Sequence, residues 1–352
     1  MKKDIFCLDW EMLVTERLGH YKLLFFLLLF PLLIHAQQYP DPKVDQLLRS
    51  GIESIVTQNY ADAELKFKRL NDNYPDLPLG SIYLAAVKMA ASIDYGEAID
   101  ENYISARLNE AEKKTDKLIE KNDHNAWNFY FLALNKGYWA YFKALNRDYI
   151  SAFSSGLSSI SKFNKCLQMD SSFYDAYIAI GTYKYWKSAK TKWVPFVSNE
   201  KELGVQYLTL ALGKNTFNHY LAQNSLMWIY INDKEYKKAA DIAEKVLSKY
   251  PGNRSFKWGL GRAYQEINKR KAIEVFEKLL SSVLELKNNN HYNEIILKHK
   301  LALLNHEVGD NKTALRLCDE ILSLKSLSDY VTDRLDDRLD KVKKLREELL
   351  RL

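Results

Sequence analysis

A helical pattern that recurs along the chain is the feature that most limits how this sequence can fold. Residues 60–75 read YADAELKFKRLNDNYP, and residues 236–251 read YKKAADIAEKVLSKYP. When the first tyrosines are aligned, Ala63 meets Ala239, and the other matched positions follow at helical intervals of three or four residues. Each segment ends in a proline. We therefore expect a helical repeat protein in which the small alanine lets a neighbouring helix approach closely.

Further copies of this pattern occur elsewhere in the chain. Residues 258–264 read WGLGRAY and precede a second helix marked by Ala272, Phe276 and Leu279. This pattern resembles the tetratricopeptide repeat. Its first helix has a large residue, small glycines and an aromatic residue, and its second helix has alanine and phenylalanine. The resemblance implies an all-α fold, a right-handed α–α superhelix (solenoid) of about seven tetratricopeptide-like helix pairs. With only 13 Gly and 7 Pro in 352 residues, a barrel or sandwich of many short strands is excluded.

The repeats predict where each helix begins. We expect the first helices of the pairs to begin near Pro42, Leu79, Asn125, Ser172, Phe217, Arg254 and Tyr292, and the second helices near Tyr60, Glu101, Tyr149, Asn199, Glu235, Lys269 and Asp310.

The two ends of the chain differ from the repeats, which we assign to residues 37–327. Residues 328–352 combine one apolar stripe with many charged residues, as a capping helix on the last repeat requires. A coiled-coil docking helix is the alternative. Residues 1–36 read as a signal peptide, with a short apolar run from Leu23 to Ile34 and a cleavage point after Ala36. Met12 is an alternative start, and an uncleaved N-terminal membrane anchor is the alternative for the leader.

The sequence contains no recognisable catalytic or metal-binding arrangement. His306-Glu307 begins like a zinc-protease helix, but Asp310 stands where the second histidine would be needed. Three Cys exclude a disulfide framework. The net charge of +6 is mild for this length and does not argue for nucleic acid. We therefore predict a binding protein without cofactors and not an enzyme.

Two stretches contain more aromatic residues than one core-facing stripe needs. The first is 127–149, and the second is 183–196, which reads YKYWKSAKTKWVPF and mixes aromatic with basic side chains. These residues either fill gaps between helices or form a surface for an anionic or amphipathic partner. The candidate partner-binding residues are Trp139, Tyr183, Tyr185, Trp186, Lys187, Lys190, Lys192, Trp193 and Phe196.

The first unit, from NYADAELKFKRL to PDLPLGSIYLA, resembles the opening repeats of exported bacterial cell-envelope proteins, such as outer-membrane assembly lipoproteins and coordinators of envelope division. The chain lacks the lipidated cysteine of the lipoproteins. The resemblance implies a scaffold in the periplasm or at the periphery of the outer membrane that holds a protein or peptide partner in the repeat groove. The alternative is a module that binds a small or polymeric ligand, such as a glycan, on the aromatic clusters. The identity of the partner and the oligomeric state stay open.

Overall fold

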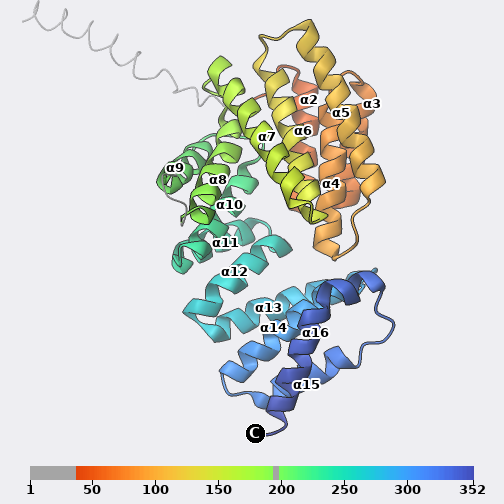
Figure 1. The fold of residues 1–352 in the computed structure, drawn as a ribbon, viewed down its shortest axis with the longest axis vertical. Helices are drawn as coiled ribbons and strands as arrows, with labels where there is room; N and C mark the ends of the chain where they lie inside the picture. The colour runs from red at the N-terminus through yellow and green to blue at the C-terminus, as the bar shows by residue number, and fades with distance from the viewer. Residues whose placement is uncertain (1–36, 193–197) are drawn as a thin grey trace, which may run out of the picture. The chain divides into compact units, whose positions relative to one another are not determined.

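The computed structural model describes residues 37–192 and 198–352. The predicted leader and its cleavage point therefore lie outside the described residues, as do Trp193 and Phe196 of the predicted binding surface. The described residues fold into helices that pack in consecutive pairs from Gln37 to Leu352 (Figure 1).

The predicted seven helix pairs and terminal helix are all present. The first helices of the pairs are α2 (Pro42–Val56), α4 (Leu79–Tyr95), α6 (Ala126–Leu145), α8 (Tyr174–Lys190), α10 (His219–Asn232), α12 (Arg254–Ile267) and α14 (Tyr292–Glu307). The second helices are α3 (Tyr60–Asn73), α5 (Glu101–Lys121), α7 (Tyr149–Met169), α9 (Lys201–Leu212), α11 (Tyr236–Lys249), α13 (Lys269–Leu284) and α15 (Asn311–Leu322). Each helix begins at or within about two residues of its predicted start, because the caps and the apolar spacing that define these helices are local in sequence.

Side-chain caps fix several of the helix boundaries. The Asn253 side chain accepts a hydrogen bond from the backbone N–H of Phe256 at 3.0 Å and so starts α12. Asn268 both ends α12 and caps α13 through the N–H of Lys271 at 3.2 Å, so the pair turns within a single residue.

The turns inside the pairs also repeat. In five of the seven pairs, a residue near the end of the first helix adopts a left-handed conformation with φ between 59° and 87°. Only two of the five are glycines, so the repeat geometry imposes this conformation even where a side chain makes it costly. The five residues are Gln58, Gly96, Arg147, Lys234 and Gly309.

The glycines of the first helices are sites of close packing. Gly51 lies against the ring of Phe67, and Gly261 lies in the same way against the ring of Phe276, so a side chain at either glycine would collide with the partner helix. This equivalence explains the repeat pattern physically, since the small residue on one helix provides the space for the aromatic residue of the next.

The last helix, α16 (Asp329–Leu349), packs against α14 and α15. Its buried residues are Val331, Leu335, Val342, Leu345 and Leu349, and most of its charged residues face solvent. The predicted capping helix is therefore confirmed. Among the described residues, none of the helices is both long and apolar enough to cross a membrane.

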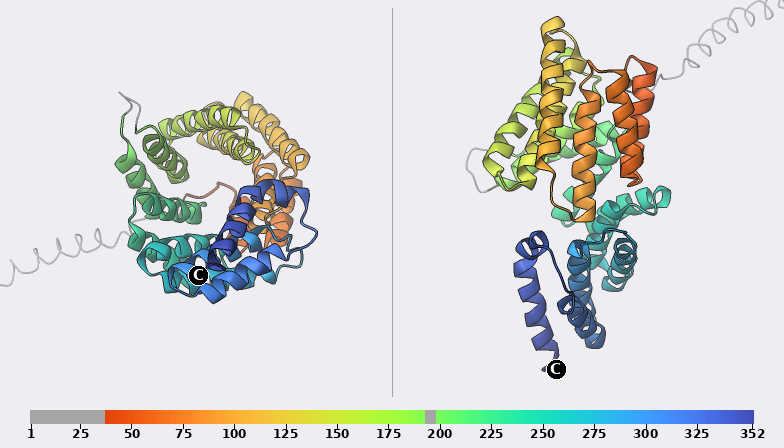
Figure 2. Two further views of the ribbon diagram at one scale, coloured as in Figure 1. Left: turned by 60° about the horizontal axis from the view of Figure 1, so that its bottom comes forward. Right: turned by 90° about the vertical axis from the view of Figure 1, so that its right-hand side faces the viewer.

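Helices from opposite ends of the array also meet. Figure 2 shows α12 lying beside the N-terminal helices rather than continuing away from them. The side chain of Asn253 donates to the carbonyl oxygen of Val56 at 2.7 Å, and that of Asn290 donates to the carbonyl oxygen of Gly96 at 2.7 Å. The superhelix thus closes on itself between the first two and the last two repeats, which the sequence pattern did not predict.

Candidate binding cavity

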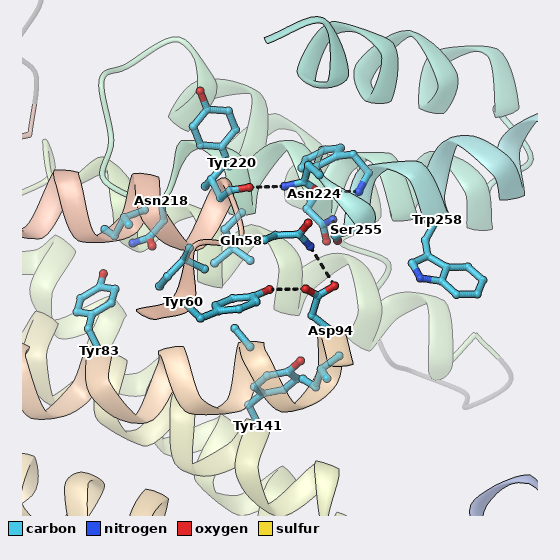
Figure 3. Close-up of a pocket in the computed structure, with 18 of the residues that line it drawn as sticks. Gln58, Tyr60, Tyr83, Asp94, Tyr141, Asn218, Tyr220, Asn224, Ser255 and Trp258 are labelled. Atoms are coloured by element: carbon cyan, nitrogen blue, oxygen red, sulfur yellow. Dashed lines mark hydrogen bonds between the residues drawn. The ribbon is translucent and has the colours of Figure 1, made fainter. Parts of the chain in front are cut away.

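The inner faces of α2, α4, α6, α10 and α12 surround a cavity of about 450 Å³ (Figure 3). All five are first helices of their pairs, as expected for the concave surface of a solenoid. The walls are rich in rings. The aromatic lining residues are Tyr60, Tyr83, Tyr138, Tyr141, Tyr220, Trp228, Phe256 and Trp258.

Four apolar side chains at the cavity remain open to solvent. Ile93 of α4, Tyr141 of α6, and Leu221 and Trp228 of α10 are each between 36% and 54% exposed. They come from three helices, α4, α6 and α10, that are not consecutive in the sequence. Such a cluster of exposed apolar side chains in one place is typical of a binding surface.

A polar network, which we call the clasp, closes one side of the cavity. It consists of Gln58, Tyr60, Asp94, Asn253 and Arg254. Arg254 Nε donates to Asp94 Oδ1 at 2.8 Å, and its Nη2 pairs with Oδ2 of the same carboxylate. Gln58 Nε2 and the Tyr60 hydroxyl also donate to this carboxylate, at 3.0 and 3.1 Å (Figure 3). The clasp therefore ties α12 to α4 and to the turn between α2 and α3.

The clasp is largely shielded from water. The side chains of Arg254 and Asp94 are only 12% and 11% exposed. Burial acts to lower the pKa of Arg254, but the hydrogen bonds and the charge of Asp94 outweigh it and raise that pKa. Burial and the neighbouring Asp94 carboxylate together raise the pKa of Tyr60, so its hydroxyl stays protonated and acts as a donor.

Tyr83 brings a hydroxyl group to the cavity wall. Its side chain is 1% exposed, and its hydroxyl oxygen is buried without a hydrogen-bond partner. Figure 3 shows the hydroxyl directed toward Asn218, although no hydrogen bond joins the two groups. Burial raises the pKa of Tyr83 well above its usual value, so the group is a neutral donor. A buried hydroxyl without a partner needs a physical explanation, because leaving it unpaired is costly.

The cavity wall carries almost no net charge. Asp94 is the one charged residue that lines it, and Arg254 neutralises this carboxylate. Within residues 37–192 and 198–352, no group of His, Cys, Asp and Glu side chains is arranged to hold a metal ion. The arrangement suits the binding of a neutral ligand.

The structure divides the predicted binding residues between core and surface. Tyr185 is fully buried, and its hydroxyl accepts from Asn232 Nδ2 at 2.7 Å, so it supports the packing of α8 on α10 and is not open to a partner. Trp139 packs with Phe142 in a cluster between α4, α5 and α6. Both positions fit the alternative that these rings fill gaps between helices.

The remaining described residues of the second stretch lie at the surface. Lys190 and Lys192 are exposed, whereas Tyr183, Trp186 and Lys187 are half-buried. Glu200 forms one ion pair with Lys184 and a second one, at 3.8 Å, with Lys187. The surface is therefore less basic than its sequence indicates.

Sequence reasoning found only part of the cavity. Tyr138 and Tyr141 belong to the first aromatic stretch, so the excess of rings in 127–149 was a usable signal. Leu221 and Trp228 of α10 carried no such signal. Asp94 and Arg254 stand 160 positions apart and resemble ordinary surface charges in the sequence.

Comparison with known proteins agrees with this architecture. Residues 226–253 match the family described as tetratricopeptide repeat. No curated protein sequence matches the chain. Among solved structures, the human IFIT1 dimer with m7Gppp-AAAA has 17% identity and a TM-score of 0.53, and the match covers 83% of this chain and 60% of that one.

Two further solved structures are similar to this chain. The Cut9–Hcn1 hetero-tetramer of the APC/C has 13% identity and a TM-score of 0.53, with 87% of this chain and 55% of that chain covered. PilW, a type IV pilus biogenesis factor, has 13% identity and a TM-score of 0.47, with 72% of this chain and 98% of that chain covered.

At these identities the likeness defines the fold, a tetratricopeptide repeat solenoid. Residues 226–253 therefore match one such repeat, and the fold is the helical-repeat solenoid that the sequence predicts. Such repeats generally mediate protein–protein interaction.

Proposed function

We propose that this protein is an exported, non-catalytic scaffold of the bacterial cell envelope that holds a protein or peptide partner in the cavity on its concave face. The observation that carries the proposal is the cluster of exposed apolar side chains at the cavity, formed by Ile93, Tyr141, Leu221 and Trp228.

The energetics of this cluster favour a macromolecular partner. Covering apolar surface is worth about 25 cal/mol per Å², so a partner that buries these four side chains would gain several kcal/mol at one spot. Aromatic residues in the centre of an interface commonly supply most of its binding energy. An extended or helical peptide can reach all four side chains, because they line the same cavity.

Export is supported by the leader sequence. Arg17 and Lys22 precede the apolar run, and Ala36 provides the small residue that a signal peptidase requires.

Site-specific photo-crosslinking in the protein's own cell tests the proposal. A benzophenone amino acid at Leu221, on the cavity, is expected to crosslink to a discrete partner protein. The matched control is Ile150 on α7, which is 86% exposed but lies away from the cavity lining. Equal crosslinking from both positions, or no protein adduct from Leu221, would contradict the proposal. The same purified protein gives the N-terminus by mass spectrometry, and a retained leader would contradict export with cleavage.

A glycan is the second candidate, favoured by the number of rings in one cavity, since sugar rings can stack on aromatic side chains. It is less well supported, because the side-chain amides of Gln58 and Asn253 already form hydrogen bonds with other groups of the protein. A sugar bound there would have to compete with those bonds.

The predicted surface around 183–192 provides a separate test of where the partner extends. Replacing Lys187, Lys190 and Lys192 together by Ala is expected to weaken partner capture and leave helicity unchanged, because these side chains lie on the surface. A pull-down of the crosslink-identified partner measures this effect. Unchanged capture would remove the basic surface from the binding site and leave the cavity as the site.

A further inference from the structure

We infer that the cavity receives an uncharged, apolar segment of the partner polypeptide, held by contacts with Tyr141, Trp228 and the other apolar side chains of the lining, with one hydrogen-bond acceptor placed at the hydroxyl of Tyr83. This inference rests on the proposed function, since it specifies the chemistry of the partner that the same site would bind.

The charge of the cavity excludes an ionic segment. No lysine or arginine lines the wall, and the one carboxylate there, Asp94, already accepts four hydrogen bonds within the clasp. A charged side chain of a partner would lose its water and find no free counter-charge, which is strongly unfavourable. A neutral segment has no such cost.

The remaining polar groups also select against a ligand rich in hydroxyls. The Tyr60 hydroxyl donates to Asp94, and the Tyr220 hydroxyl bonds to that of Tyr250 at 2.7 Å. Asn224 Nδ2 donates to Ser255 Oγ at 3.1 Å. These three groups already have protein partners, and most of the other lining side chains are rings and aliphatic groups.

The hydroxyl of Tyr83, which is buried without a partner, points to a specific contact. This hydroxyl lines the cavity, so it can donate one hydrogen bond to an incoming group. A backbone carbonyl is suited to this role, because every residue of an extended peptide carries one and it adds no charge. A ligand that satisfies Tyr83 would remove the cost of an unpaired buried hydroxyl.

The exposed apolar side chains at the cavity are the expected main contacts for the partner. Tyr141 and Trp228 present exposed rings from α6 and α10, and the exposed side chains of Ile93 and Leu221 line the same cavity. A large apolar side chain of the partner that covers these exposed groups would be shielded from water, which is the usual environment of a residue that dominates an interface.

A phage-displayed library of random 12-residue peptides tests the inference on the purified chain without its leader. Selected peptides are expected to share an uncharged core that contains at least one aromatic or large aliphatic residue. Affinity for the synthesised peptide is then measured by fluorescence anisotropy. Trp228→Ala should weaken it at least tenfold, whereas the matched control Phe153→Ala, which removes an exposed ring from α7, should leave it unchanged.

Tyr83→Phe tests the hydrogen bond. The loss of one bond to a neutral acceptor should weaken the peptide about three- to tenfold. The free protein should melt at the same or a higher temperature, since the variant removes an unpaired hydroxyl, so a change in binding would not come from unfolding.

The outcomes separate this inference from the proposed function. Selected peptides with charged cores, affinities insensitive to Trp228→Ala or Tyr83→Phe, or no selected peptide at all would each overturn the inference. If Leu221 still crosslinks to a partner in the cell through a charged segment, the scaffold function stands and only the inference fails. If neither crosslinks nor peptides appear, both fail.

Discussion

The clasp makes a strong prediction, because one substitution should open the superhelix without touching the hydrophobic core. Asp94→Asn keeps the size of the side chain but removes the charge that neutralises Arg254. In the intact protein this carboxylate receives two hydrogen bonds from Arg254, one from Gln58 and one from Tyr60. The amide can accept through only one oxygen, so it cannot replace this set.

The expected magnitude follows from the burial of the pair. With the two side chains 12% and 11% exposed, the substitution leaves a buried guanidinium without its counter-charge. Breaking such a pair typically costs 3–5 kcal/mol. Arg254 can regain water if α12 moves away from α4, which limits this cost. We therefore expect the free energy that favours the closed clasp to fall by about 3 kcal/mol. That loss corresponds to roughly a hundredfold shift toward the open arrangement.

Hydrogen–deuterium exchange with mass spectrometry is the assay, supported by small-angle scattering. Faster exchange is expected at the turn after α2 and at the start of α12, with a larger radius of gyration and an earlier melting step. The matched control is Glu266→Gln, which breaks an exposed ion pair to Arg262 on the same helix and should change stability by less than about 1 kcal/mol.

The double variant Asp94→Asn, Arg254→Met should recover part of the loss, because no buried charge is then left unpaired. If Asp94→Asn behaves like the control in exchange, scattering and melting, the reasoning about the clasp is wrong.

Two further predictions concern packing and pH. Gly181→Ala should destabilise the protein by about 1–3 kcal/mol in denaturant unfolding, because the new Cβ would lie 2.7 Å from the carbonyl oxygen of Gly204 on the adjacent helix. The control is Gly252→Ala, whose new Cβ would meet no atom within 4 Å and which should change stability by less than about 0.5 kcal/mol. If the two variants lose the same stability, this account of the contact between α8 and α9 is wrong. Burial, together with nearby Arg338, Lys341 and Lys300, lowers the pKa of His299 to about 4. The unfolded chain therefore takes up this proton first as the pH falls below about 6.5, and unfolding at pH 7 and pH 4.5 should show a loss of about 2 kcal/mol that His299→Gln abolishes. A loss that persists in this variant would assign the pH dependence to other groups.

The helices and their pairing could be predicted from the sequence because the signals that set them are local. The Tyr60 and Tyr236 segments show the same spacing of apolar residues, and their packing partners lie on adjacent helices. The interaction of Gly51 with Phe67, and of Gly261 with Phe276, spans fewer than twenty residues each. In a repeat array most contacts join neighbouring helices in this way. The residues that make them can therefore be recognised from the sequence alone.

The candidate site was only partly predictable for the same reason. The ring density in 127–149 pointed toward Tyr141, but the second stretch, 183–196, led to Tyr185, which packs inside the core. Composition can show that rings are in excess. It cannot show which of them face inward once every helix has several neighbours.

The sequence by itself determined the class of fold, the order of the helices and the terminal cap. Only the tertiary structure decided that the array curves far enough for Arg254 to meet Asp94, and that a cavity with a neutral wall and the unpaired hydroxyl of Tyr83 lies inside the curve. The physical reason is that the small rotation between neighbouring pairs accumulates along the array. Residues about two hundred positions apart are therefore brought together by the sum of many local packing angles, and no pattern within one repeat records that sum.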